Sequence, residues 1–344
     1  MQSLAVKYRP TTFDDVTEQG SIKTILTQQL ETGTHKNAYL FCGGAGTGKT
    51  TCARIFAQEL NKHRGNPIEM DAASNSGVDD VREIIEQAKK KSLDSDYKVF
   101  IIDECHSLTN QGWQAFLKLL EEPPASSIFI FCTTDPQKIP KTILSRVQRY
   151  DFQRISQQGI IRRLDYILRK EQRDTDFGIS WNDDALEYLA KLADGGMRDA
   201  ITLTDKCLSF SEQLFIENVI QALGVADYDS MFALFDSICD NKADKIIDII
   251  ERVHMSGKDL KQFIKAFTDM LLDICKYDVT KEFTYVQLPS TYNKELESYS
   301  KYEFNVAHSL LKDMCSLNAS IKWETSPKSV IESALLLEVN YQWE

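Results

Sequence analysis

The sequence lacks the features that would assign it to several common classes of protein. Its 344 residues include eight cysteines, but no two of them are spaced as Cys-x-x-Cys, so neither a zinc site nor a disulfide framework is indicated. No apolar run approaches the roughly 20 residues that cross a bilayer, and the N-terminus lacks the order of segments typical of a signal peptide. We therefore expect a cytoplasmic protein with reduced thiols and no contact with a membrane.

An excess of positive charge is missing as well. Lysine and arginine number 40 against 51 aspartates and glutamates, which gives a formal net charge of −11. Any contact with DNA must therefore come from a local patch or from partner chains, because the overall charge does not attract nucleic acid. Internal repeats, heptads and low-complexity tails are also absent, and 42% of the residues are apolar. This composition suits two or three globular domains.

The stretch Gly-Gly-Ala-Gly-Thr-Gly-Lys-Thr at 43–50 predicts a phosphate-binding loop. It follows an apolar strand at 38–41 and opens a helix at 51–56, which is the context that this loop requires. Its glycines let successive backbone N–H groups point at one anion, Lys49 adds a positive charge for the outer phosphates, and the Thr50 hydroxyl can hold Mg²⁺. The alternative is a simple glycine turn.

Apolar runs that suit buried strands alternate with segments of helical spacing. The expected strands are 38–41, 67–72, 97–102, 128–132 and 148–152, and the expected helices are 20–32, 51–56, 78–91 and 110–122. This alternation predicts a doubly wound parallel sheet of five strands that ends near residue 153. The strand signal then disappears from 156 to about 223, where helices 183–193 and 198–210 are expected, and only helices are expected from about 227 to the end.

Polar residues follow two of the expected strands. Asp103 and Glu104 end the 97–102 strand, where Mg²⁺ and an attacking water would lie in a protein with a phosphate loop. Asp103 would bind Mg²⁺ through water, and Glu104 would orient or deprotonate the attacking water. Thr133 and Thr134 end the 128–132 strand, where a polar side chain can touch the γ-phosphate or the water; the alternative is a threonine that only caps the strand.

The N-terminal arm precedes the phosphate loop. Pro10, Val6 and Val16 could close over an adenine face while Arg9 lies near the phosphates. From composition alone, an arm that merely packs against the domain fits equally well.

Several motifs are spread along the chain: Lys7-Tyr8-Arg9-Pro10, the predicted phosphate loop, Met70-Asp71-Ala72-Ala73-Ser74, Ile102-Asp103-Glu104-Cys105-His106, Leu119-Leu120-Glu121-Glu122-Pro123-Pro124, Thr133-Thr134-Asp135-Pro136-Gln137-Lys138-Ile139-Pro140, Leu144-Ser145-Arg146 and Gly196-Met197-Arg198-Asp199-Ala200. Together they resemble one known family, the bacterial DNA polymerase III gamma/tau subunit, which is the motor of the sliding-clamp loader. These motifs cover about 5–225, whereas the helical remainder fits the family's collar domain by position alone.

The resemblance implies an α/β AAA+ module with a five-stranded parallel sheet, a small helical lid domain and an all-helical C-terminal collar domain. The implied boundaries are 1–155, 156–225 and 226–344. The family usually carries a four-cysteine zinc module where only 61–66 lie here, so no zinc is expected. Val147 replaces the cysteine of the usual Ser-Arg-Cys triplet, and no segment follows the collar, so we expect a short, gamma-like form.

The resemblance also implies roles for individual residues. The residues implied to bind the nucleotide are Ala5, Arg9, Pro10, Gly43, Gly44, Ala45, Gly46, Thr47, Gly48, Lys49, Thr50, Thr51 and Arg198. The residues implied in catalysis are Lys49, Asp103, Glu104, Thr133, Arg146 and Arg198. Thr50 and Asp103 are implied to bind Mg²⁺. Thr133 resembles sensor 1, and Arg198 resembles the sensor 2 arginine of the lid. Arg146 resembles an arginine finger that acts on the ATP of a neighbouring subunit; the alternative is an ordinary surface salt bridge.

DNA contact is implied for the helix after the second strand, at Ser76 and Arg82, with a solvated helix face as the alternative. The cofactors implied are ATP and Mg²⁺. The partners implied are delta- and delta-prime-like subunits, further copies of the chain in a ring, the sliding clamp and primer–template DNA.

The implied function is ATP-driven opening of the clamp and its placement on primer–template DNA. One alternative is another AAA+ DNA motor, such as a branch-migration helicase, against which the Asp135-Pro136-Gln137-Lys138 segment and the long helical C-terminus count. The other is a catalytically silent structural subunit, which would have no need of Lys49 and Glu104.

Overall fold

A computed structural model describes residues 2–92, 94–174, 178–224, 228–302 and 304–340. The chain divides into two compact units. The first contains 1–177 and 189–205, and the second contains 178–188 and 206–344. The expected boundary at 225/226 lies outside the described residues, and the division into three domains stays a prediction.

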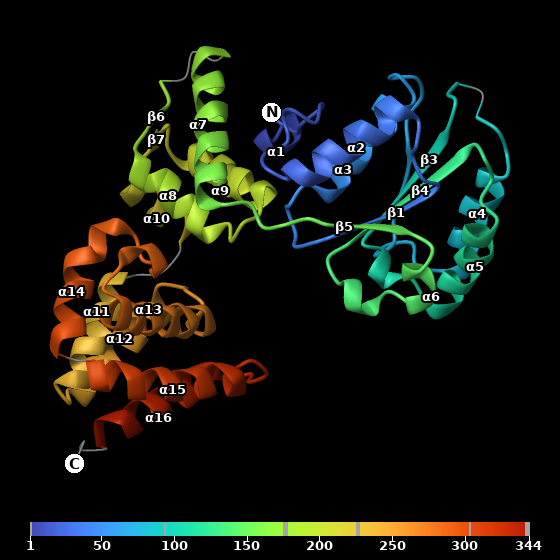
Figure 1. Cartoon of the computed structure of the whole chain (residues 1–344). Coiled ribbons are helices and arrows are strands. Elements are labelled where there is room, and N and C mark those ends of the chain that lie inside the picture. Colours follow the sequence, from blue (N-terminus) through green and yellow to red (C-terminus); the bar gives the residue numbers. More distant parts are fainter. Residues whose placement is uncertain (1, 93, 175–177, 225–227, 303, 341–344) are drawn as a thin grey trace. The chain divides into compact units, whose positions relative to one another are not determined.

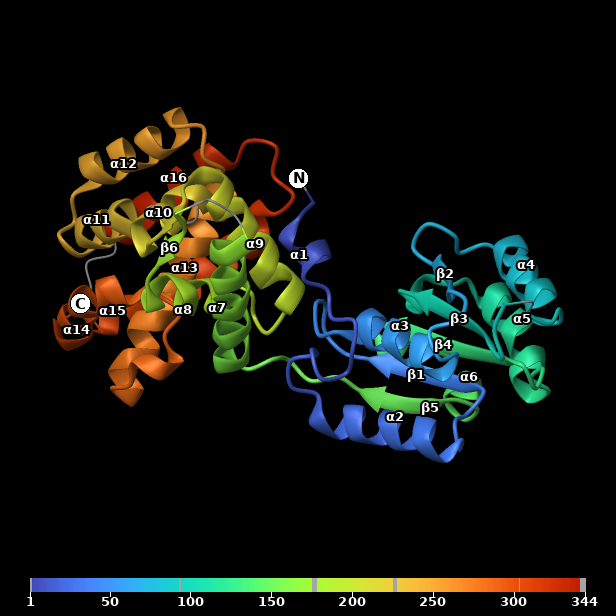
Figure 2. The same ribbon diagram turned by 90° about the horizontal axis from the view of Figure 1, so that it is seen from above.

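The first unit is built on a five-stranded sheet in which every neighbouring pair is parallel (Figures 1 and 2). The strands are β1 (Ala38–Cys42), β2 (Ile68–Asp71), β3 (Lys98–Asp103), β4 (Ser127–Thr133) and β5 (Gln148–Asp151), in the order β2-β3-β4-β1-β5. The predicted sheet is confirmed. Because its strands are parallel, all their carboxyl ends lie along one edge.

Helices cover both faces of this sheet. One face packs against α2 (Gly20–Thr32) and α3 (Lys49–Leu60), through side chains such as Tyr39, Phe41 and Ile101. The other face packs against α4 (Val78–Ala88), α5 (Asn110–Glu121) and α6 (Lys141–Leu144), through the alternate side chains, such as Leu40 and Phe100. Successive side chains of a strand point to opposite faces of the sheet. Because helices cover both faces here, a strand can be buried on both sides, and such a strand is an uninterrupted apolar run in the sequence.

The N-terminal arm is tied to a helix that follows the sheet. The arm contains the short helix α1 (Leu4–Lys7), and α7 spans Gln157–Asp174. The Tyr8 hydroxyl and the Lys7 ammonium both donate to Oε1 of Glu171 at 2.5 Å, while Arg163 donates to the carbonyl oxygen of Tyr8 at 3.1 Å. Two positions on one face of α7 therefore fix the arm.

The region expected to be purely helical contains a short pair of strands. Helices α8 (Asp183–Leu192), α9 (Met197–Phe210) and α10 (Ile216–Leu223) are present. In addition, β6 (Ser180–Trp181), just before α8, pairs in parallel with β7 (Gln213–Leu214), between α9 and α10. The expectation of no strand here was wrong, because two-residue strands are too short to leave a periodic pattern in the sequence.

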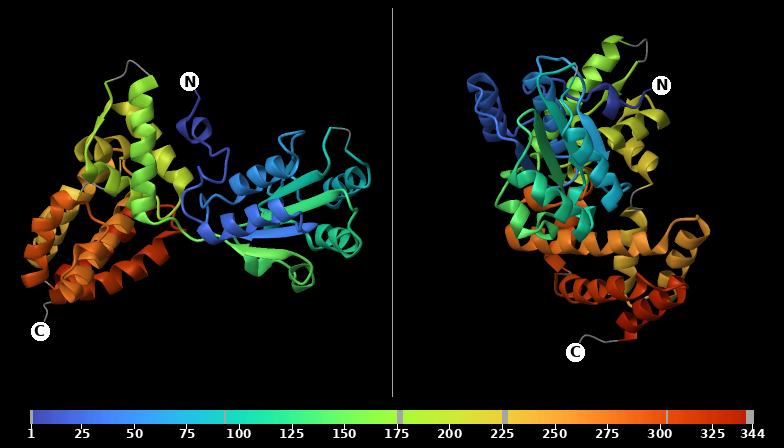
Figure 3. Two further views of the ribbon diagram at one scale, coloured as in Figure 1. Left: turned by 45° about the horizontal axis from the view of Figure 1, so that its top comes forward. Right: turned by 90° about the vertical axis from the view of Figure 1, so that its right-hand side faces the viewer.

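The rest of the second unit is helical in its described part. The helices are α11 (Tyr228–Cys239), α12 (Ala243–Met255), α13 (Leu260–Thr280), α14 (Asn293–Tyr302), α15 (Phe304–Ile321) and α16 (Pro327–Asn340). The long helix α13, orange in Figure 3, packs against α14 and α15 around a continuous apolar core. Among the described helices, none combines the length and the apolar character needed to cross a membrane.

Candidate nucleotide-binding site

The predicted phosphate-binding loop connects β1 to α3 at the carboxyl edge of the sheet. Gly46 and Gly48 have φ angles of 68° and 100°, in the left-handed region that favours glycine. The carbonyl oxygen of Gly46 accepts a hydrogen bond from the backbone N–H of Met197 at 3.0 Å. A Cβ atom at Gly46 would lie only 2.9 Å from Cα of Gly196. The loop and the turn that precedes α9 are therefore packed backbone to backbone.

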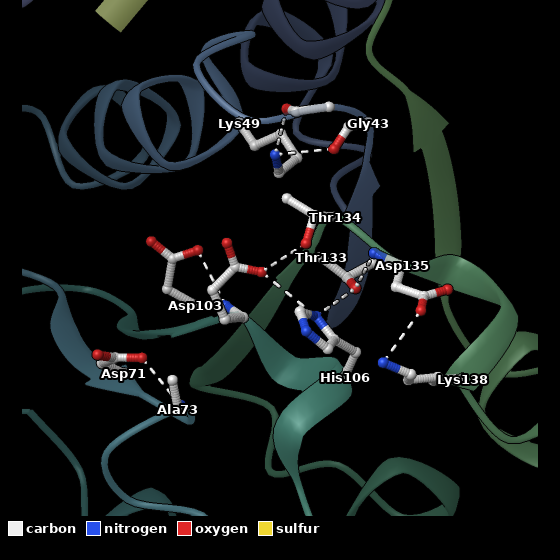
Figure 4. A network of polar contacts seen from close by, with 12 residues as sticks. Gly43, Lys49, Asp71, Ala73, Asp103, His106, Thr133, Thr134, Asp135 and Lys138 are labelled. Atoms are coloured by element: carbon white, nitrogen blue, oxygen red, sulfur yellow. Dashed lines mark hydrogen bonds and ion pairs between the residues drawn. The ribbon is translucent and has the colours of Figure 1, made fainter. Parts of the chain in front are cut away.

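Lys49 is buried at the start of α3, with 6% of its surface exposed. Its ammonium donates to the carbonyl oxygens of Gly43 at 3.0 Å and of Gly44 at 2.8 Å (Figure 4). Burial lowers the pKa of Lys49 from its ordinary value, while the nearby carboxylates of Glu104 and Asp103 oppose that shift. The predicted cation therefore lies in the loop and close to both carboxylates.

Thr50 and Asp103 meet as the sequence predicted. The Thr50 hydroxyl donates to Oδ2 of Asp103 at 2.8 Å, which joins the first turn of α3 to the end of β3. A hydroxyl and a carboxylate are hard oxygen ligands, and Mg²⁺ commonly binds one or two protein oxygens together with phosphates and waters. The pair therefore fits the predicted Mg²⁺ site.

Glu104 follows β3 in a left-handed conformation, with a φ angle of 45°. Its Oε2 atom accepts a hydrogen bond from the Thr134 hydroxyl at 3.0 Å and lies 3.3 Å from Nδ1 of His106. Thr133, which was the predicted sensor, is fully buried; its hydroxyl oxygen accepts from the backbone N–H of Asp135 at 3.0 Å and lies 3.2 Å from the same Nδ1 atom (Figure 4). The hydroxyl that donates to the Glu104 carboxylate is therefore that of Thr134, not that of Thr133.

No role was predicted for His106, and the predicted sensor was Thr133 rather than Thr134. The two threonines are adjacent at the end of a strand, where successive side chains point to opposite faces. That alternation shows that only one of them can face Glu104, but it does not show which. His106 could have been found from its position, two residues after Glu104 in the turn that follows β3.

A cavity of about 300 Å³ lies over the phosphate loop. Its lining includes these predicted residues: Ala5, Arg9, Pro10, Val16, Ala45, Gly46, Thr47, Gly48, Lys49, Thr50, Thr51, Asp103, Glu104 and Arg198. Its other lining residues are Tyr8, Thr17, Ile155, Arg163, Met197, Asp199 and Ile201. Gly43, Gly44 and Val6 do not line it. The role of Val6 was wrongly predicted, because α1 leaves its side chain 48% exposed and buries Leu4 instead.

Gln19 is a second residue that the sequence analysis missed. Its buried side-chain amide donates to the carbonyl oxygens of Gln153 at 2.7 Å and Thr47 at 3.4 Å, and its Oε1 atom accepts from the N–H of Gln153 at 3.2 Å. One side chain thus joins the phosphate loop to the segment that leaves β5. No local pattern marks such a residue, because its partners lie 28 and 134 positions away.

Arg146 lies at the opposite edge of the sheet. It borders a second hollow with residues at the start of β1 and β5, namely Lys36, Asn37, Ala38, Val147 and Gln148. Its guanidinium donates to Glu121 at 2.8 Å and to the carbonyl oxygen of Thr142 at 2.7 Å. The structure therefore does not bring Arg146 together with Lys49, since one lies at the amino ends and the other at the carboxyl ends of the strands.

The predicted DNA contacts lie around the start of α4. Arg82 is exposed and forms an ion pair with Asp79 at 3.0 Å. The backbone N–H of Gly77, at the N-terminal cap, donates to the Asp80 carboxylate at 3.1 Å. Two acidic residues in the first turn oppose the attraction that a helix N-terminus otherwise has for phosphate, so the roles of Ser76 and Arg82 stay predictions.

Family models match three successive segments of the chain. Residues 66–156 match "DNA polymerase III, delta subunit", residues 159–213 match "DNA polymerase III clamp loader subunit, ATPase lid domain", and residues 215–309 match "DNA polymerase III subunits gamma and tau domain III".

Curated proteins with similar sequences carry related names. The DNA polymerase III subunit tau of Bacillus subtilis is 34% identical over 97% of this chain and 62% of that protein. The tau subunit of Escherichia coli is 34% identical over 78% of this chain and 44% of that protein. The DNA polymerase III subunit gamma of Buchnera aphidicola is 33% identical over 76% of this chain and 77% of that protein. The chain thus spans about half of the tau relatives and most of the gamma relative.

Among solved structures, the RuvB Holliday junction branch migration motor of Thermotoga maritima is similar in fold. The TM-score is 0.52 at 19% identity, over 78% of this chain and 92% of that chain. At this identity the likeness concerns the fold alone.

The packing of the phosphate loop against the turn before α9 predicts the effect of Gly46→Ala. Alanine in a left-handed conformation costs about 1–2 kcal/mol, and its Cβ would push against backbone at Gly196. We expect amide hydrogen exchange in peptides covering 43–50 and 195–199 to rise by about tenfold, because about 1.4 kcal/mol of local stability corresponds to that factor. Hydrogen-exchange mass spectrometry measures it peptide by peptide.

Gly44→Ala is the matched control. A Cβ at Gly44 meets only the methyl group of Thr47, at 3.8 Å, and its φ angle is not left-handed. Exchange in the two peptides should then stay near the wild-type rate. An equal rise in both variants would refute the steric argument.

Proposed function

Because this chain belongs to the DNA polymerase III gamma and tau subunit family, we propose that it is the ATP-driven motor subunit of a sliding-clamp loader. It uses the binding and hydrolysis of ATP to open a sliding clamp and to place it on primer–template DNA. The proposal includes a cytoplasmic location and a multi-subunit ring that contains delta- and delta-prime-like subunits and further copies of this chain.

One observation carries the catalytic part of the proposal. A buried lysine and a hydroxyl at the start of α3 meet an aspartate and a glutamate at the end of β3, and all four residues line one cavity. A glycine-rich loop opens the helix beside them. This combination suits phosphoryl transfer to water, in which catalysis consists of positioning and of neutralising charge.

The residues of the chain divide this work between them. The backbone amides of the loop and Lys49 would hold the outer phosphates, while Thr50 and Asp103 would hold Mg²⁺. When bound, Mg²⁺ would neutralise negative charge on the phosphates. Glu104 would orient the attacking water and accept its proton. Arg198 lines the cavity from the start of α9 and would reach the γ-phosphate from the lid.

The arm and the lid would enclose the nucleotide. Ala5, Arg9 and Pro10 line the cavity from the arm, and Arg163 lines it from α7 while holding the carbonyl oxygen of Tyr8. A bound nucleotide would therefore contact both the sheet domain and α7. Loss of the γ-phosphate would then change the contacts that hold the lid. Such coupling would let ATP switch the shape of the subunit.

Arg146 would act on a neighbouring subunit. It lies at the amino edge of the sheet, whereas Lys49 and Asp103 lie at the carboxyl edge, so its own site is complete without it. A guanidinium supplied by a neighbour can raise nucleotide hydrolysis by about 10³–10⁵-fold. Hydrolysis would then depend on assembly of the ring.

DNA would be held mainly by the assembled ring. Ser76 and Arg82 are the proposed contacts, and Arg82 would exchange its ion pair with Asp79 for a phosphate. Such contacts weaken steeply with salt, so DNA-stimulated hydrolysis should fall as the salt concentration rises.

The alternatives have less support. The likeness to RuvB concerns a shared fold. The matched family models and curated relatives are all named as DNA polymerase III subunits, and the model for 159–213 is named for a clamp loader subunit. A silent subunit would not need the Thr50–Asp103 and Thr134–Glu104 hydrogen bonds. Stimulation of hydrolysis by a clamp with primed DNA, but not by four-way junctions, would separate the first two functions.

Two variants test the catalytic assignment. Lys49→Ala removes the loop's only side-chain cation, so ATP binding should weaken by at least about 100-fold while the fold stays intact. Glu104→Gln keeps the charge of Asp103 and removes the base, so ATP should bind normally while multiple-turnover hydrolysis falls by about 10²–10⁴-fold. Binding of a fluorescent ATP analogue and steady-state phosphate release, each with clamp and primed DNA, give the two quantities.

Wild-type affinity in Lys49→Ala would contradict the phosphate-loop assignment. A wild-type turnover rate in Glu104→Gln would remove Glu104 from the mechanism. Circular dichroism of both variants shows whether the fold is retained.

A mixing experiment tests the action of Arg146 across subunits. Arg146→Ala should bind ATP normally as an isolated chain, assemble with its partners and lose most of the hydrolysis stimulated by clamp and DNA, because only the transition state in the neighbouring site loses a charge. Rings that mix Arg146→Ala with Lys49→Ala should regain activity, since an intact loop can then face an intact finger. Phosphate release is measured as a function of the mixing ratio.

Glu121→Gln is a useful companion, because it breaks the ion pair of Arg146 without removing the guanidinium. It should keep more activity than Arg146→Ala. If native mass spectrometry finds both subunits side by side in the needed order and the mixture remains inactive, Arg146 does not act in trans.

A further inference from the structure

His106 links the two strand ends that carry the candidate catalytic residues. It lies in a short 3-10 turn, Cys105–Ser107, directly after β3. Its Nδ1 atom lies 3.3 Å from Oε2 of Glu104 and 3.2 Å from the hydroxyl oxygen of Thr133. Thr133 ends β4, so the imidazole bridges β3 and β4 at the edge of the sheet.

Nδ1 of His106 carries at most one hydrogen, which limits the hydrogen bonds that it can form with Glu104 and Thr133. A carboxylate only accepts hydrogen bonds, so the contact with Glu104 requires a hydrogen on Nδ1. In that tautomer the Nδ1–H also faces the hydroxyl oxygen of Thr133, which can only accept from it. If Nδ1 carried no hydrogen, Thr133 could donate to it, but Glu104 would lose the contact. The two arrangements exclude each other.

The surroundings favour the first arrangement. Oε2 of Glu104 accepts a hydrogen bond from the Thr134 hydroxyl at 3.0 Å. The hydrogen bond of Nδ1 goes to Thr133, and Nδ1 meets Oε2 at 3.3 Å as an electrostatic contact, in which a lone pair on Nδ1 would be repelled and an N–H is attracted. In the part of the chain that the structure describes, no protein group donates to the other oxygen, Oε1. Glu104 also lines the cavity.

The turn that carries His106 is well fixed. Cys105 is fully buried, and the N–H groups of Ser107 and Leu108 donate to the carbonyl oxygens of Glu104 at 2.9 Å and Cys105 at 3.1 Å. The side chain of His106 is 19% exposed. An imidazole on such a turn can hold the direction of the Glu104 carboxylate with little freedom of its own.

We propose that His106 is a positioning residue for Glu104: the Thr134 hydroxyl donates to Oε2, and the Nδ1–H of His106, held by the Thr133 hydroxyl, attracts the same oxygen from 3.3 Å, which directs Oε1 toward the attacking water. This inference rests on the proposed ATPase function and adds a residue to it. It also assigns a role to Thr133, because the Thr133 hydroxyl forms a hydrogen bond with the imidazole and so fixes its direction, rather than contacting the nucleotide. A shift of the β4 end would then alter the direction of the base.

Three substitutions at one position separate positioning from packing. His106→Asn keeps an N–H donor near the place of Nδ1, His106→Gln moves the donor to about the place of Nε2, and His106→Leu keeps the bulk without a donor. We expect kcat close to wild type for Asn, and a fall of about 10–100-fold for Leu and Gln, the range found when a residue that orients a functional group is lost. The affinity for ATP should stay within about twofold in all three, because none of them touches the phosphate loop.

His63→Leu is the matched control. His63 also lies beside a glutamate, with Nε2 at 3.5 Å from Oε1 of Glu59, but on an exposed surface and away from the cavity. Its loss should leave kcat and ATP affinity unchanged. The comparison removes effects of charge or solubility that any lost histidine would have.

Two further measurements address the mechanism directly. In a Glu104→Gln background, adding His106→Leu should lower turnover no further, because both changes act through one carboxylate. Nitrogen-15 NMR of labelled histidine in the full chain should show a hydrogen on Nδ1 of His106, assigned by the loss of that signal in His106→Asn. This second readout does not depend on hydrolysis.

The outcomes are distinct. If the wild-type chain, assembled with clamp and DNA, hydrolyses no ATP, the proposed function fails. If it hydrolyses ATP and His106→Leu matches it, or if His106→Gln matches His106→Asn, the positioning role is refuted. An Nδ1 without hydrogen in the NMR spectrum would refute it as well. Should His106→Leu not fold, the Asn and Gln comparison and the NMR spectrum still decide.

Discussion

The parallel register of the sheet is the constraint on which the candidate site depends. Cys42 of β1 pairs with Thr133 of β4, and Asp71 of β2 pairs with Asp103 of β3, so these strands end together. A polar residue that follows each strand is thereby brought to one edge, although the residues lie far apart along the chain. An antiparallel neighbour would have placed one of these ends on the opposite side of the sheet.

The packing of the two faces keeps that edge rigid. The sheet is covered by α2 and α3 on one side and by α4, α5 and α6 on the other, with almost completely buried side chains between them. The buried ammonium of Lys49 is tolerated because loop carbonyls accept its hydrogens and two carboxylates lie nearby. A buried charge without such partners would cost several kcal/mol, so the shape of the loop and the position of the lysine depend on each other.

The site is completed by contacts that join it to the arm and to α7. Gln19 connects the phosphate loop to the segment after β5, Glu171 holds the arm, and Met197 binds Gly46. These hydrogen bonds join segments that are far apart along the chain, and none of them belongs to the ladders of the sheet. The arrangement therefore suits a subunit in which a ligand in the cavity alters the attachment of the arm and of α7.

The sequence by itself determined the sheet, the glycine-rich loop before α3 and the position of Asp103 and Glu104 at the end of β3. These features are local: apolar runs report burial on both faces, and the loop needs glycine and lysine at fixed spacings. The tertiary structure alone decided that Thr134 rather than Thr133 meets Glu104, that His106 lies between them, and that Gln19 and Arg163 belong to the site. It also decided that Val6 points to solvent and that Arg146 lies at the far edge, bound to Glu121. The physical reason is that side-chain direction at a strand end, and contacts between residues more than a hundred positions apart, follow from packing and leave no periodic trace in the sequence.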